Sequence, residues 1–159
     1  MRVITIKDEF YKMCKSCGCD EELLYNKGGR PCVLLIQLKY KKKYHNFAVP
    51  LRSNISANIP KDQYFSLPPT KNTRTRNRHG IHYIKLLPIT NKYILPYYDC
   101  NKTVMKILET NNKKIVAAVQ QYLYEYEKGN GHSMTPRIDD IIDLLAFDKR
   151  GEGKENDAN

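Results

Sequence analysis

The chain has 159 residues, enough for one domain with its own core, and its 27 Lys and Arg against 17 Asp and Glu give a net charge of +10. It has neither an apolar run of about 18 residues nor a signal-peptide pattern, so we expect a cytoplasmic protein and not a membrane-spanning one. The basic surplus favours a polyanionic partner, nucleic acid before a membrane surface, and the 12 Tyr offer rings for base stacking as well as for the core.

The first part of the chain predicts a strand, a short helix and then a β-hairpin. Residues 2–6 (RVITI) have the composition of a strand, and residues 7–17 carry apolar side chains at helical spacing. The apolar run at 32–38 (CVLLIQL) is too short for a stable helix, and the three lysines at 41–43 supply a polar turn. Residues 44–53 (YHNFAVPLRS) then alternate apolar and polar positions, as a half-buried strand does.

A loop with two glycines, YNKGGR at residues 25–30, precedes the first strand of this hairpin. Glycine lets a backbone bend closely around a ligand. Residues that enter the first strand of a hairpin and residues that leave the second lie at the same end. We therefore expect five polar side chains to converge there: Tyr25, Lys27, Arg30, Arg52 and Ser53.

Short strands and a strongly basic loop follow the hairpin. Residues 63–67, 81–89 and 93–97 have the patterns of strands. Residues 71–78 (KNTRTRNR) hold four basic residues and almost nothing apolar, which predicts a solvated loop. That loop is either an ordinary surface segment or an arm that binds phosphate and becomes ordered on RNA.

The C-terminal part predicts three helices. Asn101 is placed to cap a helix over 102–109, and Asn111 or Asn112 to cap a longer helix that ends at the glycines 129–131. Thr135 followed by Pro136 predicts the start of the last helix. Several short strands with helices indicate an α+β fold. Residues 149–159 are too polar to pack and are expected to form a disordered tail, which leaves residues 1–148 as one domain.

The cysteines and the acidic residues of the last helix do not predict a metal site. Cys14, Cys17 and Cys19 resemble half of a zinc site, but only the isolated Cys32 and Cys100 remain to complete it. An odd number of cysteines also disfavours a disulfide framework. The acidic residues lie in the first turns of a helix, where they stabilise its dipole: Asp139, Asp140 and Asp143. We therefore expect free thiols, no metal and no cofactor.

Three blocks, in their order and spacing, resemble the toxins of type III toxin-antitoxin systems, the ToxN/AbiQ/CptN group of endoribonucleases. The first is Tyr25 and the basic residues that precede a buried strand, the second is AVPLRS at 48–53, and the third is GIHYIKLLPI at 80–89. A helical C-terminal half follows, so the resemblance spans roughly residues 1–147. It implies a compact, strongly bent antiparallel sheet of the SH3-like barrel type shared with the MazF and Kid toxins, with C-terminal helices.

The resemblance also implies metal-independent cleavage of RNA, in which the ribose 2′-hydroxyl attacks the phosphate and leaves 2′,3′-cyclic phosphate and 5′-hydroxyl ends. It maps Arg30, Arg52 and Ser53 onto the family's site. The two guanidinium groups are expected to stabilise the transition state, and the serine to position the phosphate or the 2′-hydroxyl. An Arg stands where some relatives have a Lys, and no Lys follows the serine.

Proton transfer needs another group, because arginine stays charged at neutral pH. His82 is the natural candidate, since the pKa of an unperturbed imidazole lies near the working pH. Tyr25 and Lys27 are the alternatives. Eight further residues are predicted to bind RNA: Lys42, Lys43, Lys71, Arg74, Arg76, Arg78, His79 and Lys85.

The resemblance implies an RNA antitoxin as the partner. That RNA is a repeat which the toxin itself cuts into pseudoknot units, and each unit blocks the active site in a closed toxin-RNA assembly. Cellular or phage RNA is the other expected substrate, and phage defence by abortive infection the expected outcome. The alternatives are a non-catalytic RNA-binding module and a basic structural subunit of a ribonucleoprotein. The hydroxyl and the imidazole near the arginines favour catalysis, because phosphate binding alone needs neither.

Overall fold

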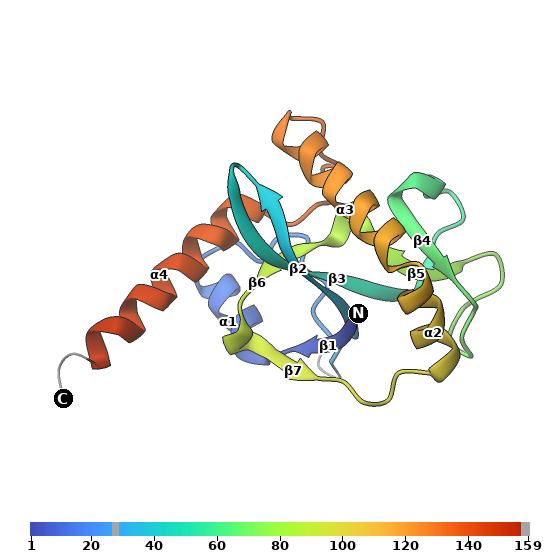
Figure 1. Ribbon diagram of the computed structural model, residues 1–159, viewed down its shortest axis with the longest axis horizontal. Helices are drawn as coiled ribbons and strands as arrows, with labels where there is room; N and C mark the ends of the chain where they lie inside the picture. The colour runs from blue at the N-terminus through green and yellow to red at the C-terminus, as the bar shows by residue number, and fades with distance from the viewer. Residues whose placement is uncertain (27–28, 157–159) are drawn as a thin grey trace.

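The computed structural model describes residues 1–26 and 29–156, which fold into seven antiparallel strands and four α-helices (Figure 1). The strands are β1 (Arg2–Ile6), β2 (Cys32–Tyr40), β3 (Lys43–Ile55), β4 (Tyr64–Leu67), β5 (Arg78–His82), β6 (Leu87–Ile89) and β7 (Ile94–Pro96). The helices are α1 (Asp8–Ser16), α2 (Lys102–Thr110), α3 (Asn112–Glu127) and α4 (Ile138–Asn156). The predicted α+β class is confirmed.

The sheet is open and does not close into the expected barrel. Its strand order is β4-β5-β3-β2-β1-β7, so β4 and β7 are its edges within the described residues, and β6 pairs with β3 beside this path. The first half of β3 pairs with β6 and its second half with β5, while β2 runs along its other side. The predicted hairpin of β2 and β3 therefore forms the centre of the molecule.

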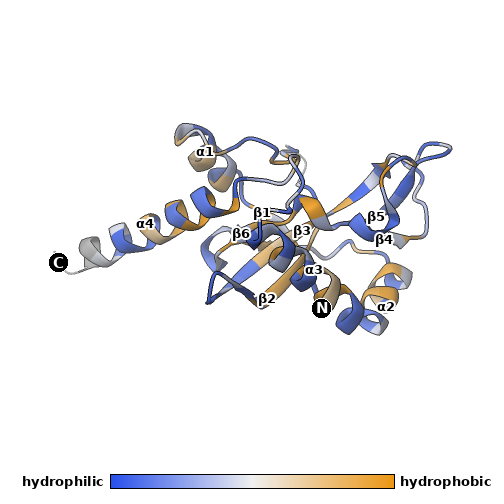
Figure 2. Ribbon diagram, turned by 90° about the horizontal axis from the view of Figure 1, so that it is seen from above, coloured by the Kyte–Doolittle hydropathy of each residue, from blue (hydrophilic) through white to orange (hydrophobic). Residues whose placement is uncertain are grey.

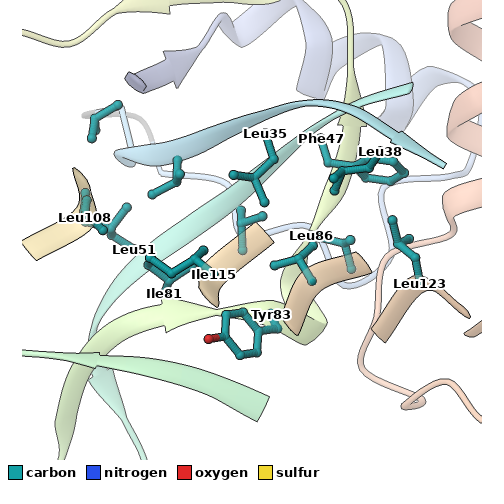
Figure 3. Close-up of a cluster of buried hydrophobic side chains, with 14 of the residues drawn as sticks. Leu35, Leu38, Phe47, Leu51, Ile81, Tyr83, Leu86, Leu108, Ile115 and Leu123 are labelled. Carbon is teal, nitrogen blue, oxygen red and sulfur yellow. The ribbon is translucent and has the colours of Figure 1, made fainter. Parts of the chain in front are cut away.

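One face of the sheet packs against α2 and α3. Leu35, Phe47 and Leu51 of the central hairpin lie in one buried cluster with Leu108 of α2 and Ile115 of α3 (Figure 3). Val119 and Leu123 continue the buried stripe of α3, and Tyr122 and Tyr126 pack against its margin, where they are only partly buried. The three-to-four-residue spacing of these positions is what places them on one helical face.

The opposite face packs against α1 and α4, a second helical layer that the pattern of the hairpin did not predict. Ile4, Leu34 and Ala48 are buried there against Phe10 of α1 and Ile141 of α4. Because both faces are covered, the stretch from Phe47 to Leu51 is buried throughout and not only at alternate positions.

Two predicted boundaries in the second half of the chain are wrong. The expected strand over 81–89 is broken into β5 and β6 by a buried 3-10 turn, Tyr83–Lys85. The last helix begins at Ile138, where the carbonyl of Arg137 accepts the first helical hydrogen bond, from Ile141. Thr135 does not cap it, because its hydroxyl pairs with the hydroxyl of Tyr122.

The chain after Lys149 is helical as far as Asn156, although its composition predicted a disordered tail. In both ribbon views α4 extends past the rest of the molecule, and its buried positions lie in its first half, up to Leu145 (Figure 2). Among the described helices, none has the length and apolarity needed to cross a bilayer.

Candidate active site

An irregularity in β3 marks the end of the hairpin where the site was expected. Arg52 pairs with Gly80 and Ile55 with Arg78. The step from the first pair to the second is therefore three residues long in β3 but only two residues long in β5. The extra residue forms a β-bulge at Ser53 and Asn54. Bulges bend a strand and re-aim its side chains, and they are common beside active sites. The bulge leaves Ser53 partly exposed at the end of the strand pairing.

Arg30 and Arg52 lie opposite each other across the hairpin. Cys32 pairs with Pro50, and the amide of Leu51 donates to the carbonyl of Pro31 at 2.9 Å. Continuing this register by one position sets Arg30 opposite Arg52. Burial, and then the positive charge of Arg30, lowers the pKa of Arg52.

Among the residues that the structure describes, the two arginines have no acidic counter-ion. None of the ion pairs among the described residues includes Arg30 or Arg52, and the buried Nε atom of Arg30 has no hydrogen-bond partner in that part of the chain. Two neighbouring guanidinium groups repel each other, and an anion bound between them relieves that repulsion. The pair is therefore suited to a phosphate group.

His82 lies directly behind Arg52. Its side chain is completely buried, and its Nδ1 atom is 2.9 Å from Nη1 of Arg52. Gly80, the strand partner of Arg52, approaches the carbonyl of Phe65 so closely that a Cβ atom would overlap its oxygen. Burial, followed by the charges of Arg52, Lys85 and His132, lowers the pKa of His82 to about 4. This histidine is neutral at pH 7 and has no exposed surface with which to touch a substrate.

Tyr25 lies at the exposed side of the cluster. Its ring is 46% exposed and packs against the ring of Tyr11, with 4.8 Å between the ring centroids. Partial desolvation and a hydrogen bond to Asp8 raise the pKa of Tyr25, so its hydroxyl keeps its proton at neutral pH. Tyr11 in turn lies close enough to Arg30 to interact with its charge. Lys27, the fifth predicted member of the cluster, lies outside the described residues.

Two residues predicted to bind RNA are buried structural residues instead. Lys85 is 3% exposed, and its ammonium group contacts a carboxylate oxygen of Glu22 at 2.5 Å and the Glu22 carbonyl at 3.3 Å. It thereby ties the segment that leads to Tyr25 to the turn after His82. His79 is 6% exposed, and its Nδ1 bonds the carbonyl of Pro68 at 2.7 Å. The prediction of RNA contact is corrected for both residues, because neither side chain reaches the surface.

The basic loop between β4 and β5 lies beside the bulge. Its four predicted RNA-binding residues are exposed: Lys71, Arg74, Arg76 and Arg78. Asn54 holds the loop, since its Nδ2 donates to the carbonyl of Asn72 at 2.9 Å and its Oδ1 accepts from the amide of Arg74 at 2.8 Å. Oδ1 also accepts from the side chain of Asn77 at 3.2 Å. The loop is therefore already held in the free protein, close to Ser53.

Lys42 and Lys43 are exposed but lie elsewhere. They belong to the turn that joins β2 to β3, at the end of the hairpin opposite Arg52. A groove of about 520 Å³ also lies towards that end, between the hairpin and α4, and Tyr44, His45 and Lys92 line it. Neither feature adds a group to the arginine cluster.

No group of three or more metal-ligating side chains occurs among the described residues. All five cysteines are free thiols. Asp139 accepts from the hydroxyl of Tyr40 and pairs with Lys41, and Asp140 pairs with Arg137. These carboxylates therefore take part in structural contacts of helix α4.

Sequence reasoning missed three residues around the cluster. Asp8 and Tyr11 come from α1, and their only sequence signal was a position in a short helix, which says nothing about what the helix approaches. Asn54 directly follows Ser53, but it lies outside the strand predicted over residues 44–53. All three residues come close to the cluster through contacts between segments that are distant in the sequence.

Three solved structures share the fold of the whole chain. A protein of a bacterial antiviral system that a processed non-coding RNA regulates has a TM-score of 0.63 and 16% identity, over 90% of this chain and 96% of that one. A protein of the bacterial type III toxin-antitoxin systems, from work on toxin inhibition by a non-coding RNA pseudoknot, has a TM-score of 0.65 and 16% identity, over 93% and 97%.

The third structure is AbiQ, a lactococcal anti-phage endoribonuclease of a type III toxin-antitoxin system. Its TM-score is 0.63 and its identity 15%, over 93% of this chain and 98% of that one. No protein-family model and no curated protein sequence matches the chain. The resemblance to type III toxins expected from the sequence is confirmed at the level of the fold.

Proposed function

We propose that this protein is an endoribonuclease toxin of a type III toxin-antitoxin system. The observation that carries the proposal is the pair Arg30 and Arg52, which forms no ion pair with a carboxylate of the described residues and lies beside the partly exposed Ser53. Four exposed basic side chains on the loop held by Asn54 extend this positive surface. The shared fold with toxins of this class supports the same interpretation.

The proposed reaction needs no metal, because the nucleophile comes with the substrate. The ribose 2′-hydroxyl gives up its proton to solvent water and attacks the adjacent phosphorus, the bond to the 5′-oxygen breaks, and that oxygen takes up a proton, so that the products are a 2′,3′-cyclic phosphate and a 5′-hydroxyl. Negative charge builds on the phosphoryl oxygens in the transition state. Arg30 and Arg52 stabilise that charge, since a guanidinium group can donate to two phosphate oxygens at once. Ser53 holds the phosphate or the attacking hydroxyl by a hydrogen bond.

Tyr25 is assigned to the leaving group. The 5′-oxygen must gain a proton as it departs, and the Tyr25 hydroxyl carries one at neutral pH. Its raised pKa makes it a weaker acid than an unperturbed tyrosine, and it also keeps the phenolate, the form that a base would need, unpopulated. Its exposed ring also offers a surface on which a base can stack.

The proposed inhibitor and second substrate is RNA as well. Solved proteins with this fold come from systems in which a processed non-coding RNA regulates the protein or an RNA pseudoknot inhibits the toxin. We extend this to a repeat RNA that the protein cuts into pseudoknot units and that then covers the arginine cluster in a closed assembly. Release of the toxin during infection would direct it to cellular or phage RNA, which is abortive phage defence.

Inducible expression in a bacterial host tests the proposal. Induction of the wild-type chain should stop growth and should yield RNA fragments with 5′-hydroxyl ends, whereas Ser53→Ala at equal abundance should do neither. Ser56→Ala, at an exposed serine two residues after Asn54, is the matched control and should behave as wild type. RNA that is bound but intact on induction of the wild-type chain would identify a non-catalytic RNA-binding module and reject the enzyme.

A further inference from the structure

The role of His82 follows from where it lies. We propose that His82 is a positioning residue, which fixes the guanidinium group of Arg52 for the phosphate, and that it does not transfer protons itself. This inference rests on the proposed function, because it assigns a task within the same RNA-cleavage site. It replaces the proton-transfer role that the sequence suggested for this histidine.

Burial excludes direct contact between His82 and a substrate in this conformation. His82 has 0% exposure, whereas Arg52, which its ring contacts, is partly exposed. A group that takes a proton from a ribose hydroxyl must come within hydrogen-bond reach of that hydroxyl. His82 instead reaches Nη1 of Arg52, at 2.9 Å.

The direction of this hydrogen bond is determined by the chemistry of arginine. A guanidinium group has only donors, so Nδ1 of His82 must be the acceptor and the proton of the neutral ring must be on Nε2. Protonation of Nδ1 would replace the acceptor by a donor and would set two cations against each other. The low pKa of His82, caused by burial and by Arg52, Lys85 and His132, agrees with a ring that stays neutral.

The other ring nitrogen of His82, Nε2, is buried and has no hydrogen-bond partner among the described residues. A buried donor without a partner destabilises the fold, so the hydrophobic surroundings alone do not favour a histidine here. The contact that the ring does make is the one with Arg52.

A guanidinium group that is held in one position stabilises the transition state better than a mobile one. One Arg52 nitrogen is held by His82, and the β-bulge directly after Arg52 fixes the backbone that carries it. The remaining donors then face the site without the loss of side-chain freedom that would otherwise accompany phosphate binding. Lysine could not be held in this way and still present a planar fork.

Three variants of His82 and a double variant with Arg52 test the proposal. In His82→Asn the amide oxygen falls near the position of Nδ1 and can still accept from Arg52. His82→Leu has no acceptor for Arg52. His82→Gln places its amide oxygen further from the backbone than Nδ1 and therefore also loses the hydrogen bond to Arg52. It replaces the leucine variant if that variant does not fold. Single-turnover cleavage of a labelled RNA and the Kd for that RNA are measured for each, after a thermal melt.

The proposal predicts that the cleavage rate of His82→Asn lies within about threefold of the wild-type rate. The cleavage rates of His82→Leu and His82→Gln should fall by about tenfold or more, and the Kd for RNA should change less than the rate. The double variant Arg52→Ala/His82→Leu should be no slower than Arg52→Ala, because His82 acts only through Arg52. Losses that multiply in the double variant would show an independent role and overturn the proposal. So would full activity of His82→Leu. If the wild-type chain cleaves no RNA, the proposed function fails, which is a distinct outcome.

Discussion

Asn54 Oδ1 accepts a hydrogen bond from the backbone amide of Arg74 at 2.8 Å, which joins the bulge of β3 to the basic loop before β5. The same side chain reaches Asn72 and Asn77, so one neutral residue holds three points of a loop whose charges repel each other. The residue that positions this positive surface therefore carries no charge itself.

Asn54→Ala should release the loop without changing the net charge. Loss of three hydrogen bonds is expected to destabilise the protein by about 1–3 kcal/mol, and the backbone amide of Arg74 should exchange with solvent faster. RNA affinity should fall, because the loop must then be ordered on binding. Asn58→Ala is the matched control, since the exposed side chain of Asn58 makes no hydrogen bond within the described part of the chain. Unchanged exchange in Asn54→Ala would show that the loop holds itself.

The basic loop should contribute to the salt dependence of RNA binding. Lys and Arg that contact phosphates release counter-ions, so neutralising Arg74, Arg76 and Arg78 should lower the slope of log K against log salt by roughly one contact for each arginine. Lys12, Lys15 and Lys106 are exposed on helices α1 and α2 and provide a control with the same loss of charge. Equal effects of the two triple variants would mean that the loop acts only through the net charge.

The buried imidazole should make the protein sensitive to acid. The pKa of His82 is lowered from 6.5 to about 4, so between these values the unfolded chain binds a proton that the folded chain does not. Stability therefore falls as the pH falls through this window, by at most roughly 3 kcal/mol for this group. His82→Asn should show a smaller loss between pH 6.5 and 4 in chemical denaturation. Parallel stability curves for the two proteins would contradict the assigned burial of a neutral ring.

Ser53 and Arg52 should separate cleavage from binding. Ser53→Ala removes a hydroxyl and no charge, so it should abolish cleavage and leave RNA affinity nearly intact. Arg52→Ala removes a charged donor used in both steps and should also weaken binding, by roughly 1.5 to 3 kcal/mol. Titration with an uncleavable RNA measures the affinities. A Ser53→Ala variant that cleaves normally would place the reaction at another part of the surface.

Local patterns predicted the centre of the fold and the proximity of Arg30 to Arg52. Alternation and turn chemistry located the hairpin, and hairpin geometry alone set Arg30 opposite Arg52. Asn101 caps α2 as expected, with its Oδ1 accepting from Thr103 and Val104. These features depend on residues that are close in sequence or joined by one turn.

Features set by distant packing were not predictable. Lys85 resembles a surface cation in sequence, and only the approach of Glu22 makes its burial possible. His82 resembles a catalytic base until the strands β4 and β5 enclose it. The open sheet likewise depends on the pairing of β7 with β1, two strands that lie far apart in the sequence.

In the proposed reaction the RNA itself supplies the nucleophile, which one cleavage assay can test. A labelled RNA that the protein cuts is incubated with it in excess EDTA, beside the same RNA with a single 2′-deoxyribose at the cut site. We predict that the first RNA is cleaved to 2′,3′-cyclic phosphate and 5′-hydroxyl ends and that the second stays intact, since its nucleophile is missing. Cleavage that stops in EDTA, or that proceeds at the deoxyribose, would contradict the account.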